Sequence, residues 1–172
     1  MTLSEIPSAT EIFIDANIFV YHFSGPTELT AACSTFLRRI EDRDLSGFTS
    51  LTVLAEVLHR LMIIEATETL QVEARHAVRY RKEHPTEVRK LTRHLGVPET
   101  IQAIGVHMLA PTLDDVLTSQ EEKLAFGLLT NDAITLAVMK RHHLTHIATN
   151  DPDFARVTSL HVWHPSPIPP SA

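Results

Sequence analysis

The sequence of 172 residues contains a single cysteine, Cys33, and only five glycines. One cysteine excludes an intrachain disulfide and is typical of proteins from a reducing compartment, so we expect a cytoplasmic protein. No run approaches the roughly 18 uninterrupted apolar residues of a membrane helix. Residues 1–10 lack the basic start and apolar core of a signal peptide. We therefore expect neither a membrane anchor nor a disulfide scaffold.

Positive charge is also scarce, because the formal net charge is −6 with histidine neutral. This balance argues against unselective binding to nucleic acid. Residues 75–94 differ, since seven basic residues there face two glutamates, giving a local charge of +5 and leaving −11 for the rest. This basic segment is either a solvated helical face or a patch that holds phosphates. Its basic residues are Arg75, Arg79, Arg81, Lys82, Arg89, Lys90 and Arg93.

The apolar pattern favours one α/β domain over residues 1–172, since 44% hydrophobic and 21% charged residues are ordinary values for a globular chain. Runs of β-branched and aromatic residues predict strands at residues 12–14, 45–50, 145–149 and 160–164. Helical spacing predicts helices at residues 27–40, 54–61, 65–95, 114–128 and from 130 onward. This order predicts a three-layer α/β/α sandwich around a parallel sheet of four to five strands.

Three segments lie outside this core pattern. Residues 1–10 and the proline-rich residues 165–172 are predicted to be flexible tails. Residues 65–110 are predicted to form an inserted or extended helical region. Within it, Pro85 suits the first turn of a helix, and Gly96-Val97-Pro98 is interpreted as a stop signal.

Acidic residues stand where two predicted strands end. Asp15 follows the strand at 12–14, and burying its charge unpaired would cost several kcal/mol. It therefore needs a partner, a cation or water. Asp151 and Asp153 follow the strand at 145–149. Because ligands of parallel sheets bind outside the carboxyl ends of the strands, we expect these acids at one binding edge.

Two helical acids are expected at the same edge. Asp132 lies in the first turn of a helix whose N-cap we expect to be Thr130 or Asn131, where the helix dipole favours negative charge. Glu56 lies opposite the apolar stripe of its helix, so it can face a cleft while the stripe packs. Taken alone, Asp132 can also be explained as a residue that starts a helix, and Asp151 as part of an Asn-Asp-Pro turn.

A cluster of such carboxylates has a chemical requirement. Clustered carboxylates repel one another, and their pKa values rise unless a cation compensates. All-oxygen ligation suits Mg²⁺ or Mn²⁺. One or two such ions can activate water and stabilise the leaving oxygen in an in-line attack on a phosphodiester. The pattern therefore favours a metal-dependent nuclease.

Four stretches, in this order, resemble the PIN-domain ribonucleases, which include the toxins of VapBC-type toxin–antitoxin pairs: IFIDANIFVY, TSLTVLAEVLHRL, LLTNDAITLAVMKRHHLTHIATNDPDF and LHVWHP. By position, the resemblance implies catalytic, metal-binding carboxylates at Asp15, Glu56, Asp132 and Asp151, with Asp153 as an alternative to Asp151. It also implies that polar side chains hold the acids or waters, namely those of Asn17, Ser50 and Thr149.

The resemblance further implies an Mg²⁺- or Mn²⁺-dependent endoribonuclease with a five-stranded parallel sheet in 3-2-1-4-5 order. Its implied partners are an RNA substrate, a second copy of the chain in a homodimer and a small antitoxin protein. The span between Glu56 and Asp132 is longer than in small toxins of this type. The excess includes the basic segment, whose basic residues are the candidate RNA contacts.

Two other functions stay open from the sequence. A non-catalytic PIN-like module that binds RNA or protein would carry the same acids, and cleavage assays would separate the two. Two Glu-x-x-His motifs, Glu56 to His59 and Glu73 to His76, have the spacing of di-iron carboxylate sites. Those sites need four long helices, which the predicted strands fit poorly.

Other candidate ligands have simpler explanations. His142, His143 and His146 match zinc spacing, but a loop between a helix and a strand explains them as well. Cys33 lies among apolar neighbours at helical spacing, so we interpret it as a small core residue. Trp163 is interpreted as a packing residue of the last strand.

Overall fold

The computed structural model describes residues 1–25, 27–69, 79–80 and 82–167. Its sheet has five parallel strands in the order β3-β2-β1-β4-β5. The strands are β1 (Glu11–Ile14), β2 (Ser46–Ser50), β3 (His107–Leu109), β4 (His146–Ala148) and β5 (His161–Trp163). The sheet confirms the predicted fold class and the implied strand order.

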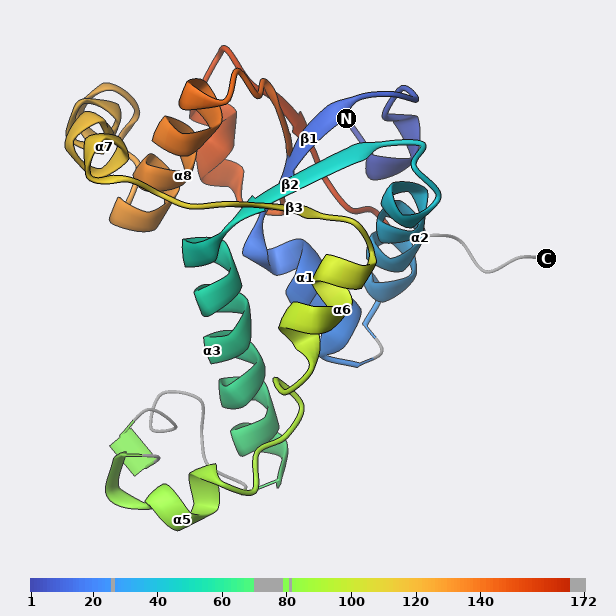
Figure 1. Cartoon of the computed structure of the whole chain (residues 1–172), viewed down its shortest axis with the longest axis vertical. Helices are drawn as coiled ribbons and strands as arrows, with labels where there is room; N and C mark the ends of the chain where they lie inside the picture. Colours follow the sequence, from blue (N-terminus) through green and yellow to red (C-terminus); the bar gives the residue numbers. More distant parts are fainter. Residues whose placement is uncertain (26, 70–78, 81, 168–172) are drawn as a thin grey trace.

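Helices cover both faces of this sheet. The helices are α1 (Ala16–Phe23), α2 (Thr30–Glu41), α3 (Leu51–Thr69), α5 (Pro85–Val88), α6 (Val97–Ala103), α7 (Leu113–Phe126) and α8 (Thr130–Arg141). Two 3-10 turns complete the described elements, η1 (Leu3–Glu5) and η2 (Pro152–Arg156). Helices α1, α2 and α6 lie on one side of the strands, and α7 and α8 lie on the other (Figure 1).

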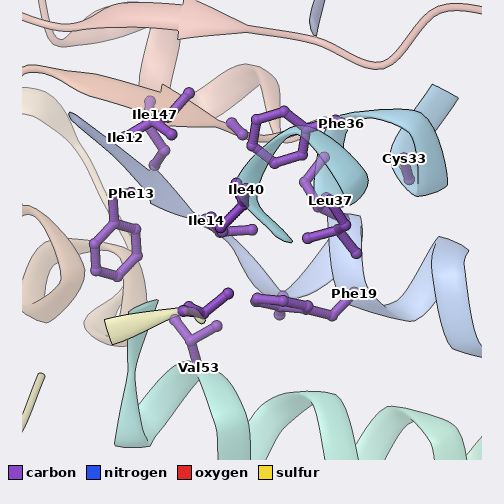
Figure 2. Packing of buried hydrophobic residues seen from close by; sticks show 14 of the residues in the cluster. Ile12, Phe13, Ile14, Phe19, Cys33, Phe36, Leu37, Ile40, Val53 and Ile147 are labelled. Carbon is purple, nitrogen blue, oxygen red and sulfur yellow. The ribbon is translucent and has the colours of Figure 1, made fainter. Parts of the chain in front are cut away.

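The strand β1 lies in the middle of the sheet, which explains its continuous apolar run. Its residues Ile12, Phe13 and Ile14 are completely buried. Figure 2 shows Ile12 and Ile14 near the aromatic and aliphatic side chains of α2, while Phe13 points the other way, as strand alternation requires. Gly47 of β2 lets α2 approach, since a Cβ there would lie 2.9 Å from Cδ1 of Ile40.

The strand order creates a switch point beside β1. The chain runs from β1 to β2 and β3 on one side and then returns to β4 on the other side of β1. Ligands of open α/β sheets bind at such a point, outside the carboxyl ends of the strands. Here the backbone N–H of Asp15 donates to the carbonyl of Ala148 over 3.0 Å, joining the ends of β1 and β4.

The N-terminal segment differs from the flexible tail predicted for residues 1–10. Leu3 and Ile6 are only 3% exposed and pack into the core. The N–H of Leu3 donates to the carbonyl of His164 over 3.0 Å, and the guanidinium of Arg39 donates to the carbonyl of Ile6 over 2.7 Å. Of the second predicted tail, residues 168–172 lie outside the described residues.

Several predicted helix boundaries were wrong. Gly96 takes a left-handed conformation (φ 75°) and precedes α6, which has Pro98 in its first turn, so this stretch starts a helix rather than ending one. The N-cap of α8 is Leu129, not Thr130 or Asn131, and it makes no side-chain capping bond.

The helical prediction for residues 65–95 holds only in part. Helix α3 continues to Thr69, and Pro85 begins α5 as expected, but turns occupy residues 89–90 and 93–96. Residues 70–78 and 81 lie outside the described residues. The resemblance implied a fifth strand, but no segment was predicted for it, and β3 lies within residues 65–110, where a helical region was predicted. Within the described ranges, no helix is long and apolar enough to cross a membrane.

Candidate acidic site

Asp15 lies at the switch point, between β1 and α1. It is the N-cap of α1, and its Oδ1 accepts the N–H of Ala16 over 2.7 Å. Its Oδ2 accepts two side-chain bonds, from the hydroxyl of Thr149 and from the amide of Asn17, each 2.6 Å long. These bonds fix the orientation of the carboxylate at the edge of the sheet.

Thr149 and Asn17 tie the two central strands together around Asp15. The Thr149 hydroxyl is completely buried and accepts the N–H of Asp151 over 2.9 Å and the amide of Asn17 over 3.1 Å. The Asn17 carbonyl oxygen in turn accepts the N–H of Asn150 over 2.9 Å. The loop that follows β4 is therefore built around the same side chains that hold Asp15.

The pKa values show that the predicted acids lie within electrostatic reach of one another. Burial raises the pKa of Asp15, and the charges of Glu56 and Asp151 add to this, although the Thr149 hydroxyl and the Ala16 N–H act in the opposite direction. The pKa of Asp132 is raised to about 6. Burial is the largest cause, and the negative charges of the neighbouring acids add to it in the order Asp151, Asp15, Glu56 and Asp153. The acids from four parts of the chain thus form one cluster.

Three of these acids make further contacts. Glu56 is about one third exposed, and its Oε1 lies 3.5 Å from Nη1 of Arg60. Asp151 caps η2 by accepting the N–H of Asp153 over 2.9 Å. Asp153 is paired with Arg156 over 2.6 Å, and its charge has the smallest effect on Asp132. Asp151 is therefore the better candidate for the fourth acid.

The donor set fits a hard divalent cation. It consists of carboxylate oxygens, and every factor that shifts the pKa of Asp132 raises it, so none of the basic groups that the structure describes compensates that charge. In the part of the chain that the structure describes, no three His, Cys, Asp or Glu side chains converge closely enough to hold an ion as they stand. Asp15 and Asp151 are thus fixed by hydrogen bonds from backbone and side-chain groups, while the charge of Asp132 is not compensated by any described residue.

The remaining predicted side chains have different surroundings. The buried Ser50 hydroxyl contacts that of Thr52 over 2.8 Å and accepts the N–H of Val53 over 3.2 Å, so it starts α3 rather than holding an acid. Asn150 was not predicted, although its side-chain amide donates to the Tyr21 hydroxyl over 3.0 Å and its N–H to Asn17. Asn150 directly precedes the predicted acid Asp151, and this adjacency is the sequence signal that could have indicated it.

The described part of the basic segment, residues 79–80 and 82–94, lies at the far end of α3 from β2 (Figure 1). Three of its cations have acidic neighbours, since Arg79 pairs with Glu83, Lys90 with Glu87 and Arg93 with Glu68, over 2.8, 2.9 and 2.7 Å. Lys82 and Arg89 are exposed. The candidates Arg75 and Arg81 lie outside the described residues.

A buried carboxylate fixes part of this segment to α3. Glu65, 7% exposed, accepts the N–H groups of Thr92 and Arg93 over 3.0 and 2.9 Å. Glu65 lies nine residues after Glu56, which is about 13 Å along a helix. The Thr92 and Arg93 backbone is therefore attached to α3 well beyond Glu56 along the helix.

The other sequence interpretations can now be compared with the fold. The parallel sheet excludes the four-helix bundle that the Glu-x-x-His motifs require, and Glu73 and His76 lie outside the described residues. Burial raises the pKa of the Cys33 thiol to about 12, which confirms it as a core residue. Trp163 is buried, and its indole N–H donates to His146 Nδ1 over 3.0 Å.

Sequence and fold together define the class of this protein. The sequence model of the PIN domain matches residues 12–160, so the chain belongs to the PIN-domain family. Among its relatives, Ribonuclease VapC2 of Methanocaldococcus jannaschii is 26% identical over 153 residues, which cover 88% of this chain and 92% of the relative.

Solved structures show the same fold. VapC20 of Mycobacterium tuberculosis, described as a sarcin-ricin loop cleaving toxin, superposes with a TM-score of 0.58 at 15% identity, covering 86% of this chain and 95% of VapC20. A toxin–antitoxin complex from Klebsiella pneumoniae contains a chain with a TM-score of 0.53 at 21% identity, covering 91% of this chain and 99% of that one.

The Thr149 hydroxyl gives a stability prediction for this site. Thr149→Val keeps the shape but removes the hydroxyl, so the part-buried Asp151 N–H and the Asn17 amide lose an acceptor and the Asp15 carboxylate loses a donor. We expect unfolding free energy to fall by about 2–3 kcal/mol in urea titrations. Thr145→Val, at an exposed position, is the control and should change little. Equal stability of both variants would contradict the network.

Proposed function

We propose that this chain is an Mg²⁺- or Mn²⁺-dependent endoribonuclease and the toxin of a toxin–antitoxin pair. The observation that carries the proposal is the cluster of carboxylates at the switch point, where burial and mutual repulsion raise the pKa values of Asp15 and Asp132. Membership of the PIN-domain family and the similarity to Ribonuclease VapC2 support RNA as the substrate.

Asp15, Glu56, Asp132 and Asp151 are the residues proposed to hold the ion. A bound Mg²⁺ or Mn²⁺ would compensate the clustered charge, and such ions lower the pKa of water and stabilise phosphoryl oxygens. Asp153 is left out because Arg156 already pairs with it over 2.6 Å.

Other side chains of this protein are proposed to prepare the site. Thr149 and Asn17 hold the Asp15 carboxylate in one orientation, and their bonds to the loop after β4 place Asp151 beside it. Because these bonds exist in the folded chain, the Asp15 carboxylate is already oriented before an ion binds. The exposed cations of the basic segment, Lys82 and Arg89 among them, would attract the RNA backbone.

The same proposal covers partners and location. The Klebsiella pneumoniae neighbour is a toxin–antitoxin complex, which supports a small antitoxin protein as a partner of this chain. We also propose that the protein acts as a homodimer in the cytoplasm.

RNA cleavage by the purified protein tests this function. We expect a structured RNA to be cut with Mg²⁺ or Mn²⁺ and left intact when EDTA is added, because the acids then hold no ion. Cleavage should return when Mn²⁺ is added in excess over EDTA. Folded protein that cuts no RNA with either ion, or cuts equally in EDTA, would contradict the proposal.

A further inference from the structure

The side chains of Tyr21 and Asn150 form a polar pair beside the acidic cluster. The Asn150 amide donates to the Tyr21 hydroxyl over 3.0 Å. Tyr21 lies four residues after Asn17 on α1, so these two side chains share one face of that helix, one turn apart. The backbone N–H of Asn150 donates to the side-chain oxygen of Asn17, and Asn150 directly precedes Asp151. The pair therefore stands at the rim of the proposed ion site.

The hydrogen-bonding capacity of this pair is only partly used. Among the described residues, the Tyr21 hydroxyl makes that one contact, as an acceptor, so its own proton is left to donate. The Asn150 side chain also makes only that contact with a described residue, which leaves its carbonyl oxygen to accept. Asn150 is exposed and Tyr21 is partly exposed, so a ligand can reach the pair. A donor and an acceptor thus lie on two directly bonded groups.

This pair is not needed to place Asp151. The loop after β4 is already held by Asn17 and by the buried Thr149 hydroxyl, which accepts the N–H of Asp151 over 2.9 Å. A hydrogen bond between solvent-accessible side chains adds little to stability, because water can replace either partner. The Tyr21 and Asn150 side chains are therefore available for a bound substrate.

The proposed reaction gives such a contact a purpose. The ribose 2′-hydroxyl takes no part when water attacks a phosphodiester in line, so this chemistry alone would cut DNA as readily as RNA. Selection of RNA must then come from recognition of the 2′-hydroxyl or of the sugar shape that it imposes. The 2′-hydroxyl is both a donor and an acceptor. The Tyr21 O–H and the Asn150 side-chain oxygen are its complement.

We propose that Tyr21 and Asn150 bind the 2′-hydroxyl of a ribose next to the cleaved phosphodiester and so select RNA over DNA. The Tyr21 O–H donates to the 2′-oxygen, and the 2′-O–H donates to the Asn150 side-chain oxygen. This role depends on the proposed endoribonuclease function, for which it supplies the choice of sugar. A neutral hydrogen bond of this kind changes affinity by about 2- to 10-fold.

Binding of matched single strands to the full chain tests the proposal, with EDTA present so that no probe is cut. The probes are a short RNA pool of random sequence, DNA with deoxyuridine in place of thymidine, and 2′-fluoro RNA. All three carry the same bases and phosphates, so the repulsion from the acids is equal. We expect the wild type to bind RNA about 2- to 10-fold more tightly than DNA. The 2′-fluoro RNA keeps the sugar shape of RNA but cannot donate, so it should bind like DNA.

Tyr21→Phe and Asn150→Ala should each reduce the RNA preference to less than about twofold and leave DNA binding unchanged. Both variants should fold, because phenylalanine keeps the Tyr21 ring and Asn150 is exposed, and circular dichroism checks this. Gln102→Ala is the matched control, since it removes an exposed amide from α6 and should keep the wild-type preference. With Mn²⁺ present, the ratio of the RNA and DNA cleavage rates should fall in the same two variants.

A wild type that binds RNA and DNA equally would overturn the proposal, as would 2′-fluoro RNA that binds like RNA. Variants that bind or cut both nucleic acids less well at an unchanged ratio would also overturn it, because a purely positioning role requires that result. A wild type that cuts neither nucleic acid contradicts the nuclease proposal instead. The binding preference in EDTA still decides the role of Tyr21 and Asn150 in that case.

Discussion

Asp15→Asn and Asp132→Asn are each expected to reduce RNA cleavage by at least about 10²–10³-fold while leaving the fold intact. Each change keeps the side-chain shape but removes one negative charge from the cluster, and with it the attraction for a divalent ion. Asn at position 15 can still accept the Thr149 hydroxyl, so α1 and β4 should stay joined. The measurement is single-turnover cleavage of a labelled RNA under saturating Mn²⁺.

Matched controls make this comparison specific. Asp153→Asn changes an acid only two residues beyond Asp151, but one that is paired with Arg156. Asp114→Asn changes an exposed acid of α7 outside the cluster. We expect the first to cut with a loss below about tenfold and the second to cut like the wild type. Equal cleavage by wild type and Asp15→Asn would indicate a contaminating nuclease and would remove the support for the carboxylate assignment.

Asp132→Asn is also expected to make the protein more stable than the wild type without metal, and to lose this advantage when metal is added. In EDTA the variant should be more stable than the wild type by about 1–2 kcal/mol, because the pKa of Asp132 is raised to about 6 and the half-exposed carboxylate is ionised at pH 7. At 100 times its dissociation constant, Mn²⁺ should add about 2.7 kcal/mol to the wild type and much less to the variant. Thermal unfolding of both proteins, with EDTA or Mn²⁺, measures all four values.

The pH dependence supplies the control for this reversal. A carboxyl whose folded pKa is raised costs stability where the unfolded chain ionises more readily than the folded one, so the penalty grows from about pH 3.8 and is complete above about pH 6. The difference between variant and wild type in EDTA should therefore vanish near pH 4. Burial lowers the pKa values of His22 and His146 in both proteins, and their titration cancels in the difference. A constant difference from pH 4 to 8 would contradict the assignment.

The sequence predicted the parts of this fold that depend on strong local patterns. The run from Ile12 to Ile14 is buried on both faces in the central strand, so continuous apolarity and position in the sheet agree. Strand β3 was missed because two of its residues, His107 and Met108, are exposed at the edge of the sheet and carry no apolar alternation. Its pairing with β2, from Phe48 onward, supplies what the local sequence does not.

The acidic residues of the site could be predicted from the sequence, whereas most of the hydrogen bonds that support them could not. Asp15, Asp132 and Asp151 follow from strand ends and a helix start, because topology alone brings such positions to one edge. The bond from Asn150 to Asn17 joins residues 133 apart in the chain, and no local pattern indicates it. The buried polar face of α7 was equally hidden, since Asp115 and Glu122 are buried only because Arg141 and Lys140 of α8 meet them.

The most direct test of the central claim is the anomalous scattering of Mn²⁺ in crystals of the protein soaked with that ion. We expect a peak between the carboxylates of Asp15, Asp132 and Asp151, and no such peak in crystals of Asp132→Asn. The ligand oxygens should lie about 2.0–2.3 Å from the ion. Full occupancy of a site elsewhere, for example at His142 and His143, with none at the acidic cluster, would contradict the account.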